Sequence, residues 1–277
     1  MAMPNTTMRP ASVSIILPTY NERENIQVLI PQVQTAFAGV PLEVVVVDDS
    51  SPDGTAEAAR ALNRVYGNIR VILRLKKEGI GAAIRHGLDE ARHDILITSD
   101  SDMSFRAADM VTLYQKILEG NDMVIGSRHS SGSQYDRTHW DIKLKYLVSH
   151  FGNRFLTAVT GIKLNDFSAN FRAVRRNVWR FLKITEKTNT ILLEMILKAT
   201  YGGVRVTEIP VTFGERLHGK SKLNLSVEAP KFLVKMVKYV FRYRFTGYNI
   251  SLHEAVHIAE SKPDSLSGVT PPTDRSA

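Results

Sequence analysis

The sequence contains no cysteine, so disulfide bonds and thiolate chemistry are excluded. This lack is compatible with the cytosol, where disulfides are rare. The chain also lacks a run of about 18 apolar residues, and we therefore expect no transmembrane helix. Residues 1–12 are polar and lack the apolar core of a secretory signal, so they are predicted to be a disordered N-terminus.

What the chain does contain is a large apolar fraction and an excess of positive charge. Its 277 residues are 43% hydrophobic, which suits one large α/β domain or a domain with a helical appendage. The formal net charge of +8 favours an anionic partner, such as nucleic acid, an anionic membrane or a phosphorylated substrate. No recognised nucleic-acid motif accompanies the charge, so nucleic acid is not an expected partner.

Short apolar segments alternate with helical patterns along residues 13–127. This alternation predicts an α/β fold with a mostly parallel, doubly wound central sheet flanked by helices. Polar groups follow several of the apolar segments, and the carboxyl ends of parallel strands are where such sheets bind ligands. We expect strands at residues 13–17, 42–47, 70–75, about 95–99 and 123–125.

Two acids, Asp100 and Asp102, directly follow the buried strand that begins at Ile95. On a regular strand their side chains would share one face and point in parallel. A turn beginning near Asp100 would let them converge on one cation, and a hard cation such as Mg²⁺ is held by one or two carboxylates plus substrate phosphates. The sequence therefore favours a metal–diphosphate site, and the alternative is a solvated acidic turn.

The other strand ends carry groups that suit a nucleotide. Tyr20 could stack on a base and Glu22 could hold a sugar hydroxyl, although the same stretch is also a strand–turn–helix joint with Asn21 as the expected helix cap. Acids at the end of the second strand could accept hydrogen bonds from a nucleoside or cap the next helix. Gly79 and Gly81 would let backbone N–H groups approach a phosphate, but two glycines are a weak signal.

The second half of the chain is richer in cations. Residues 129–139 are predicted to form a mobile loop over the site. Lys145 and Ser149 lie four residues apart on an expected helix, where they could cradle an acceptor phosphate or form a solvated face. Residues 215–222 hold four cationic residues, His218 counted among them, and a glycine, which suits an anion trap or a solvated basic turn.

A basic amphipathic helix is expected near residues 226–246. Such a helix can lie in the headgroup region of a membrane, or it can pack on the catalytic domain with its basic face in water. Residues 247–277 are polar and predicted to be a largely disordered tail.

Several motifs occur in the order seen in family 2 glycosyltransferases of the GT-A fold, and the chain resembles that family over about residues 13–225. Within it, the later segments at residues 166–173, 193–195 and 209–222 are most similar to the dolichyl- and polyprenyl-phosphate mannose synthases. The early motifs are Pro18-Thr-Tyr-Asn-Glu22, Val47-Asp-Asp-Ser-Ser-Pro-Asp-Gly54, Gly79-Ile-Gly81, Asp100-Ser-Asp102 and Gly126-Ser-Arg128.

The resemblance implies a GT-A catalytic domain over residues 13–225, with GDP-mannose as donor and Mg²⁺ or Mn²⁺ as cofactor. It implies a polyprenyl (dolichyl-type) phosphate as acceptor and inverting transfer, on the cytoplasmic face of a membrane. A membrane-anchoring subunit is a further candidate partner. The implied catalytic residues are Asp102, Arg128 and Arg216; the donor site is Pro18, Tyr20, Glu22, Asp49, Gly79, Gly81, Asp100 and Lys222; the acceptor phosphate site is Arg128, Lys145, Ser149 and Arg216; and the metal ligands are Asp100 and Asp102.

The chain departs from the family pattern at three positions. Ser104 falls where family members often supply a third metal ligand, commonly Gln. Lys145 stands where they usually have Arg, and lysine lacks the bidentate fork that clamps phosphate. Asn170 replaces a more usual Gly, and asparagine tolerates the left-handed conformation that such a turn could require.

Two other transferase reactions remain as alternatives. A family 2 enzyme that glycosylates a hydroxyl would need a carboxylate base. Polysaccharide synthases of that kind resemble one another in a Gln-x-x-Arg-Trp segment, which precedes neither Trp140 nor Trp179. The second alternative is a polyprenyl-phosphate glycosyltransferase that uses UDP-glucose or another nucleotide sugar.

Overall fold

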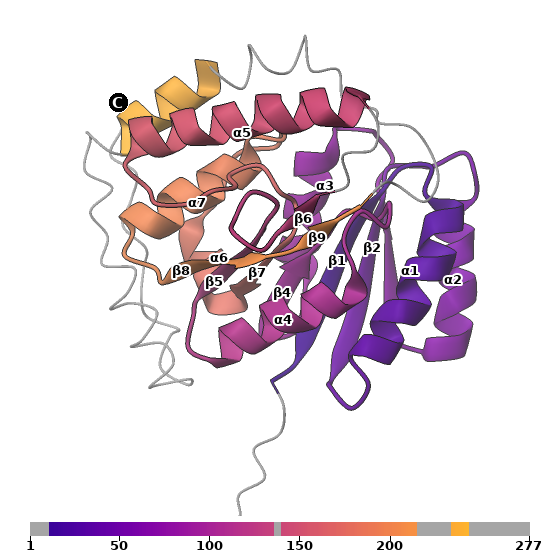
Figure 1. Cartoon of the computed structure of the whole chain (residues 1–277). Helices are drawn as coiled ribbons and strands as arrows, with labels where there is room; N and C mark the ends of the chain where they lie inside the picture. The colour runs from indigo at the N-terminus through magenta and orange to yellow at the C-terminus, as the bar shows by residue number, and fades with distance from the viewer. Residues whose placement is uncertain (1–10, 136–139, 215–233, 244–277) are drawn as a thin grey trace, which may run out of the picture.

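A mixed sheet of seven strands forms the centre of the computed structural model, which describes residues 11–135, 140–214 and 234–243. The strand order is β3-β2-β1-β4-β7-β5-β8, and β7 is the antiparallel member (Figure 1). The expectation of a mostly parallel sheet is therefore confirmed. The strands are β1 (Val13–Thr19), β2 (Leu42–Asp48), β3 (Ile69–Leu73), β4 (Ile95–Thr98), β5 (Met123–Ser127), β7 (Arg172–Arg175) and β8 (Val206–Pro210).

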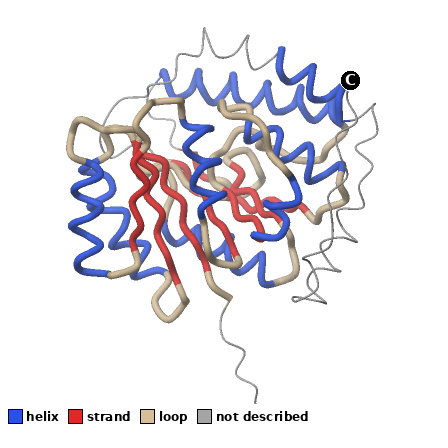
Figure 2. The backbone as a smooth tube through the Cα atoms, turned by 180° about the vertical axis from the view of Figure 1, so that it is seen from behind, coloured by secondary structure: helices blue, strands red, loops and turns tan. Residues whose placement is uncertain are grey.

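Helices cover both faces of this sheet (Figures 1 and 2). Alternate residues of β2 enter different clusters: Val44 and Val46 pack on one side, and Val45 and Val47 on the other. Burial on both faces explains why the strands read as continuous apolar runs in the sequence. The helices are α1 (Arg23–Ala36), α2 (Thr55–Tyr66), α3 (Ile80–Glu90), α4 (Ala107–Leu118), α5 (Trp140–Thr160), α6 (Arg176–Leu182) and α7 (Ile191–Tyr201).

The antiparallel strand β7 positions part of the site. It lies between β4 and β5, and its first residue, Arg172, pairs with Thr98 on one side and with Ile125 on the other. Because β7 runs opposite to its neighbours, the loop before it arrives at the edge where β4 and β5 end. Residues 166–171 therefore lie beside the segments that follow those two strands.

A short strand, β6 (Gln134–Tyr135), lies within the stretch that was expected to be a mobile loop. It pairs with β9 (Thr212–Phe213), which follows β8 closely in the sequence. Isolated two-residue strands leave no periodic pattern to detect in a sequence.

The expected cap of α1 is wrong. Asn21 has a φ of 55°, and Glu22 is the N-cap without a side-chain capping hydrogen bond. The backbone N–H groups of residues 21–23 instead donate to Ser51, Thr55 and Asp53 of the turn after β2. Side chains that follow β2 thus accept the hydrogen bonds that a capping side chain at Asn21 was expected to accept.

The helical segment at residues 234–243 lies beside α5 (Figure 1). Its buried face holds Met236, Val240 and Tyr243, which pack into the same cluster as α7. The rest of the predicted amphipathic helix lies outside the described residues. Among the described helices, none is both long enough and apolar enough to cross a bilayer.

Candidate active site

The two acids after β2 have different surroundings. Asp48 accepts hydrogen bonds from the Thr19 hydroxyl at 2.8 Å and from the N–H and hydroxyl of Ser51 at 2.9 and 2.6 Å. Asp48 therefore stabilises the turn. Asp49, the predicted nucleoside ligand, is 5% exposed and forms an ion pair with Arg74 at 2.9 Å. Burial raises the pKa of Asp49, and the nearby Arg74 opposes this rise.

Arg74 was not among the predicted site residues. Arg74 directly follows β3, as the other site residues follow their strands. Its position at a strand end could therefore have identified it from the sequence. Its guanidinium also contacts Glu78 at 2.8 Å, so it connects Asp49 to the segment before α3.

Tyr20 is the residue predicted to stack on a base. The Lys77 ammonium group lies over its ring, 3.5 Å from the ring centroid. This contact joins the turn after β1 to the segment that leads into Gly79. The Pro18 carbonyl accepts a hydrogen bond from the Ser101 hydroxyl at 2.9 Å, so the end of β1 also contacts the Asp100–Asp102 turn. Glu22 accepts a hydrogen bond from Asn25 at 2.6 Å.

The two glycines before and within α3 are required for different reasons. Gly79 has a φ of +95° and open space around its α-carbon, so its conformation is what favours glycine. A Cβ at Gly81 would overlap the carbonyl oxygen of Thr188. Gly81 is therefore required for the close packing of residues 187–188, whether or not a phosphate binds nearby.

Asp100 and Asp102 lie in the turn after β4, as the sequence predicted. Asp102 is 4% exposed, and its Oδ1 accepts hydrogen bonds from the Ser104 N–H at 3.0 Å and the Ser104 hydroxyl at 2.6 Å. Oδ1 of Asp100 accepts a hydrogen bond from the Asn170 amide at 3.0 Å. Met103, between Asp102 and Ser104, has a φ of 67°, so the turn includes a left-handed residue.

These residues fit a hard divalent cation. Carboxylate oxygens are the ligands that Mg²⁺ and Mn²⁺ prefer, and hydrogen bonds from neutral groups orient them without cancelling their charge. Within the described ranges, no group of three or more His, Cys, Asp or Glu side chains is arranged to hold a metal. The described residues therefore offer neutral oxygens as further ligands, and substrate phosphates and water could complete the shell.

A second cluster begins where β5 ends, and Arg128 is its centre. The Arg128 guanidinium forms a bidentate pair with Asp166, with Nε–Oδ2 at 2.7 Å and Nη2–Oδ1 at 3.0 Å, and Nη2 also donates to the Ser168 hydroxyl at 2.7 Å. Although complete burial raises the pKa of Asp166, Arg128 holds that pKa well below its usual range. The Arg128 side chain is thereby fixed in one orientation.

The predicted acceptor residue Ser149 belongs to the same cluster. A hydrogen bond of 3.0 Å joins its hydroxyl to Nε2 of His129, the residue after Arg128. Asn153, one turn along α5, donates to Ser149 at 3.4 Å and accepts from the Phe167 N–H at 3.1 Å. Helix α5 is thus joined to the ends of β5 and of the loop before β7.

Phe213 connects the cluster around Arg128 to the aspartate turn. The Arg128 guanidinium carbon lies 5.3 Å from the Phe213 ring centroid, and that ring packs edge-on against Phe105 at 5.1 Å. The Gly214 N–H donates to the Ser104 carbonyl at 3.0 Å. The candidate metal ligands and Arg128, the predicted acceptor-phosphate ligand, therefore lie at one edge of the sheet.

Three predicted cations cannot be placed in this site. Arg216 and Lys222 lie outside the described residues. Lys145 is part of α5, but its side chain also lies outside what the structure describes. Their roles remain predictions.

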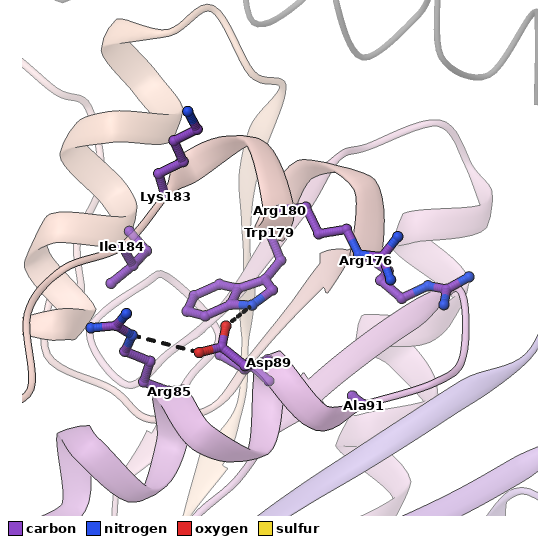
Figure 3. Close-up of a pocket in the computed structure, with 9 residues that line it drawn as sticks. Arg85, Asp89, Ala91, Arg176, Trp179, Arg180, Lys183 and Ile184 are labelled. Carbon is purple, nitrogen blue, oxygen red and sulfur yellow. Dashed lines mark hydrogen bonds and ion pairs between the residues drawn. The ribbon is translucent and has the colours of Figure 1, made fainter. Parts of the chain in front are cut away.

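A cavity of about 240 Å³ lies elsewhere, between α3 and α6 (Figure 3). Its Asp89 accepts a hydrogen bond from the Trp179 indole at 2.9 Å and contacts Arg85 at 3.6 Å. Figure 3 shows Arg176, Arg180 and Lys183 pointing away from Asp89. None of the predicted site residues lines this cavity, and its cations do not converge, so we assign the site to the sheet edge instead.

The chain is similar to several known proteins. Residues 14–182 match the model of the family described as Glycosyl transferase family 2. A dolichol-phosphate mannosyltransferase of Pyrococcus furiosus is 34% identical over 233 residues, which are 83% of this chain and 63% of that protein. A polyprenol monophosphomannose synthase of Mycolicibacterium smegmatis is 31% identical over 226 residues, which are 79% of this chain and 83% of that protein.

Among solved structures, glucosyl-3-phosphoglycerate synthase from Mycobacterium tuberculosis, in complex with Mn²⁺, UDP and phosphoglyceric acid, superimposes with a TM-score of 0.63. The identity is 15%, and the match covers 83% of this chain and 78% of that one, so it shows a shared fold. The expected GT-A fold is thereby confirmed. With the family model matching more than half of its length, the chain belongs to glycosyl transferase family 2.

Proposed function

We propose that this enzyme transfers mannose from GDP-mannose to a polyprenyl phosphate of the dolichyl type. The observation that carries the proposal is the shared edge of the sheet, where Asp100 and Asp102 lie near Arg128 and Ser149. The two curated relatives, whose names specify mannose and a polyprenyl or dolichol phosphate, support this choice of substrates. UDP-glucose with the same class of acceptor remains the alternative donor.

The site must bring two anions together, the acceptor lipid phosphate and the nucleoside diphosphate sugar. A lipid phosphate oxygen attacks the anomeric carbon, while the bond to the nucleoside diphosphate breaks and its electron pair leaves with the diphosphate. The attacking phosphate is already ionised near neutral pH, so no protein base is needed. In-line attack inverts the anomeric centre and gives a β-linked sugar phosphate.

The residues divide this task. Arg128, with Lys145 and Arg216 predicted beside it, holds the acceptor phosphate against the repulsion of the donor. Asp100 and Asp102 hold a divalent cation, which supplies positive charge to the leaving diphosphate. Tyr20 and Asp49 bind the nucleoside, and the segment of Gly79 and Gly81 binds the diphosphate. Lys222, which lies outside the described residues, is predicted to stabilise the leaving diphosphate.

A membrane surface is the place where such an acceptor is found. Apolar side chains are exposed along α5 and along residues 234–243, which lie beside one another. Basic side chains, Lys238 and Arg242, accompany them and favour anionic lipid. We propose that this face rests on the cytoplasmic leaflet, with or without an anchoring subunit. The exposed apolar residues are Leu147, Phe151, Phe155, Val234, Val237 and Phe241.

A donor panel tests the proposal. The full chain is incubated with Mg²⁺ or Mn²⁺, a short polyprenyl phosphate and either GDP-mannose, UDP-glucose or UDP-GlcNAc, and the product is identified by its mass. We expect a mannosyl phosphate lipid from GDP-mannose. A glucosyl product from UDP-glucose with none from GDP-mannose would establish the alternative, and a polyprenol control without phosphate should give no product.

A further inference from the structure

Asn170 lies two residues before β7, with its side chain against the aspartate turn. The residue is 5% exposed, and its Nδ2 donates to Oδ1 of Asp100 at 3.0 Å. An ionised carboxylate can only accept hydrogen bonds, so the amide nitrogen must be the atom that faces Asp100. The position of the other amide atom, Oδ1, is fixed as a consequence.

That oxygen is buried and has no hydrogen-bond partner among the described residues. A buried polar atom without a partner is costly, and each one calls for an explanation such as an ion or a water that binds there. An amide oxygen is also a ligand type that hard divalent cations accept.

We propose that Asn170 belongs to the cation site and that its Oδ1 supplies a neutral oxygen to the coordination shell of the divalent ion held by Asp100 and Asp102. This inference rests on the proposed function in one respect, because that function places a divalent ion at these aspartates. The side chain has two tasks: Nδ2 orients Asp100, and Oδ1 adds an oxygen that carries no charge.

Ser104 has a different task in the same site. Its hydroxyl donates to Asp102 at 2.6 Å, so it orients that carboxylate. In this proposal the neutral oxygen that the family resemblance placed at position 104 comes instead from Asn170, which hydrogen-bonds to Asp100. In this chain the cation shell is completed from the loop before β7.

The test measures binding of Mn²⁺ alone to the full chain, by electron paramagnetic resonance of the free ion. Substitution Asn170→Ala is sterically mild, because Asn170 is not among the non-glycine residues of positive φ in the described chain. We expect it to raise the Kd for Mn²⁺ about tenfold, a loss typical of groups that support metal ligands. Asn170→Asp, which restores an oxygen but not the amide donor, should bind Mn²⁺ more tightly than the alanine variant.

Thr200→Val is the matched control. The Thr200 hydroxyl is another buried atom without a partner among the described residues, but it lies on α7. Its removal should leave the Kd for Mn²⁺ unchanged. If the alanine variant does not fold, Asn170→Gly serves in its place, because it also removes the amide and adds no bulk.

Equal Mn²⁺ affinity in the wild type and the alanine variant would overturn the inference, as would a wild type that binds no Mn²⁺. If the aspartate variant binds no better than alanine, the oxygen has no role and Asn170 only orients Asp100. No sugar donor or lipid is present, so failure of mannosyl transfer leaves this result standing. Conversely, mannosyl transfer with unaltered Mn²⁺ binding in the alanine variant would retain the proposed function and reject the role of Asn170.

Discussion

The Asp100–Asp102 pair at the sheet edge and the Glu186–Glu194 pair beneath residues 234–243 differ in the groups that hydrogen-bond to them. Asp100 and Asp102 receive hydrogen bonds from an amide, a hydroxyl and a backbone N–H. Lys235 contacts Glu186 at 3.0 Å, and Lys198 contacts Glu194 at 3.0 Å. These neutral donors orient the two aspartates, whereas the lysine ammonium groups also neutralise the two glutamates.

Tyrosines of the helical segment at residues 234–243 complete the second pair. Tyr239 donates to Glu186 at 2.6 Å and Tyr243 donates to Glu194 at 3.2 Å. Burial and then the neighbouring glutamates raise the pKa of both hydroxyls, so these tyrosines stay protonated and remain donors. The two glutamates therefore stabilise the packing of residues 234–243, whereas the two aspartates are the proposed ligands of a cation.

The largest effect is expected from Asp102→Asn. The change removes one charge from the proposed cation site but keeps the acceptor for Ser104, so the turn should survive. We expect the transfer rate to fall by on the order of 10³, as several kcal/mol of charge stabilisation is lost. Product formation measures the loss, and an unchanged near-ultraviolet circular dichroism spectrum shows that the fold is intact. Full activity in this variant would show that the charge of Asp102 is not needed for transfer, and the proposed difference between the aspartate pair and the glutamate pair would be lost.

The next effect concerns stability. Glu194→Gln leaves the Lys198 ammonium group, which is 6% exposed, without its buried counter-charge. We expect the free energy of unfolding to fall by about 3 kcal/mol, because breaking a buried pair leaves one charge uncompensated. Urea unfolding measures this change. Binding of Mn²⁺ should stay at the wild-type level, and a loss of Mn²⁺ affinity in the folded variant would contradict the structural role of this pair.

The smallest effect is a pH dependence from Glu186. Burial raises the pKa of Glu186, but hydrogen bonds from Tyr239 and Lys235 outweigh it and lower the pKa to about 2. A carboxyl group with a lowered pKa stabilises the fold above its unfolded value, and this contribution is lost as the pH falls toward the folded value. We expect Glu186 to contribute a loss of about 1 kcal/mol between about pH 5 and about pH 3.5.

Unfolding of the Glu186→Gln variant over the same pH range isolates that contribution. Glutamine does not titrate, so the difference in stability between wild type and variant should shrink as the pH falls. A difference that stays constant with pH would show that the charge of Glu186 does not stabilise the fold.

The early strand ends could be predicted from the sequence because each is a local pattern. An apolar run followed by a polar turn identified the positions of Asp49, Asp100 and Arg128, and the structure brings the last two to one edge. The parallel pairing of most strands followed from the rule that strand–helix alternation gives a parallel sheet.

The contacts that orient these residues could not be predicted in the same way. The pairing of Arg128 with Asp166 spans 38 residues and that of Asn170 with Asp100 spans 70, and both depend on the insertion of the antiparallel strand β7. The N–H groups at the start of α1 likewise found acceptors in another turn, because β1 and β2 lie side by side. Local propensity does not contain such information.

Thr188 sits between two parts of the chain that the sequence separates widely. Its carbonyl oxygen occupies the space that a side chain at Gly81 would need, and its hydroxyl accepts a hydrogen bond from Lys235 at 2.9 Å. Lys235 thus contacts the residue whose backbone packs against Gly81 at the start of α3. Under the proposed function, a shift of residues 234–243 at a membrane surface would be transmitted through Thr188 to Gly81, next to the proposed donor site.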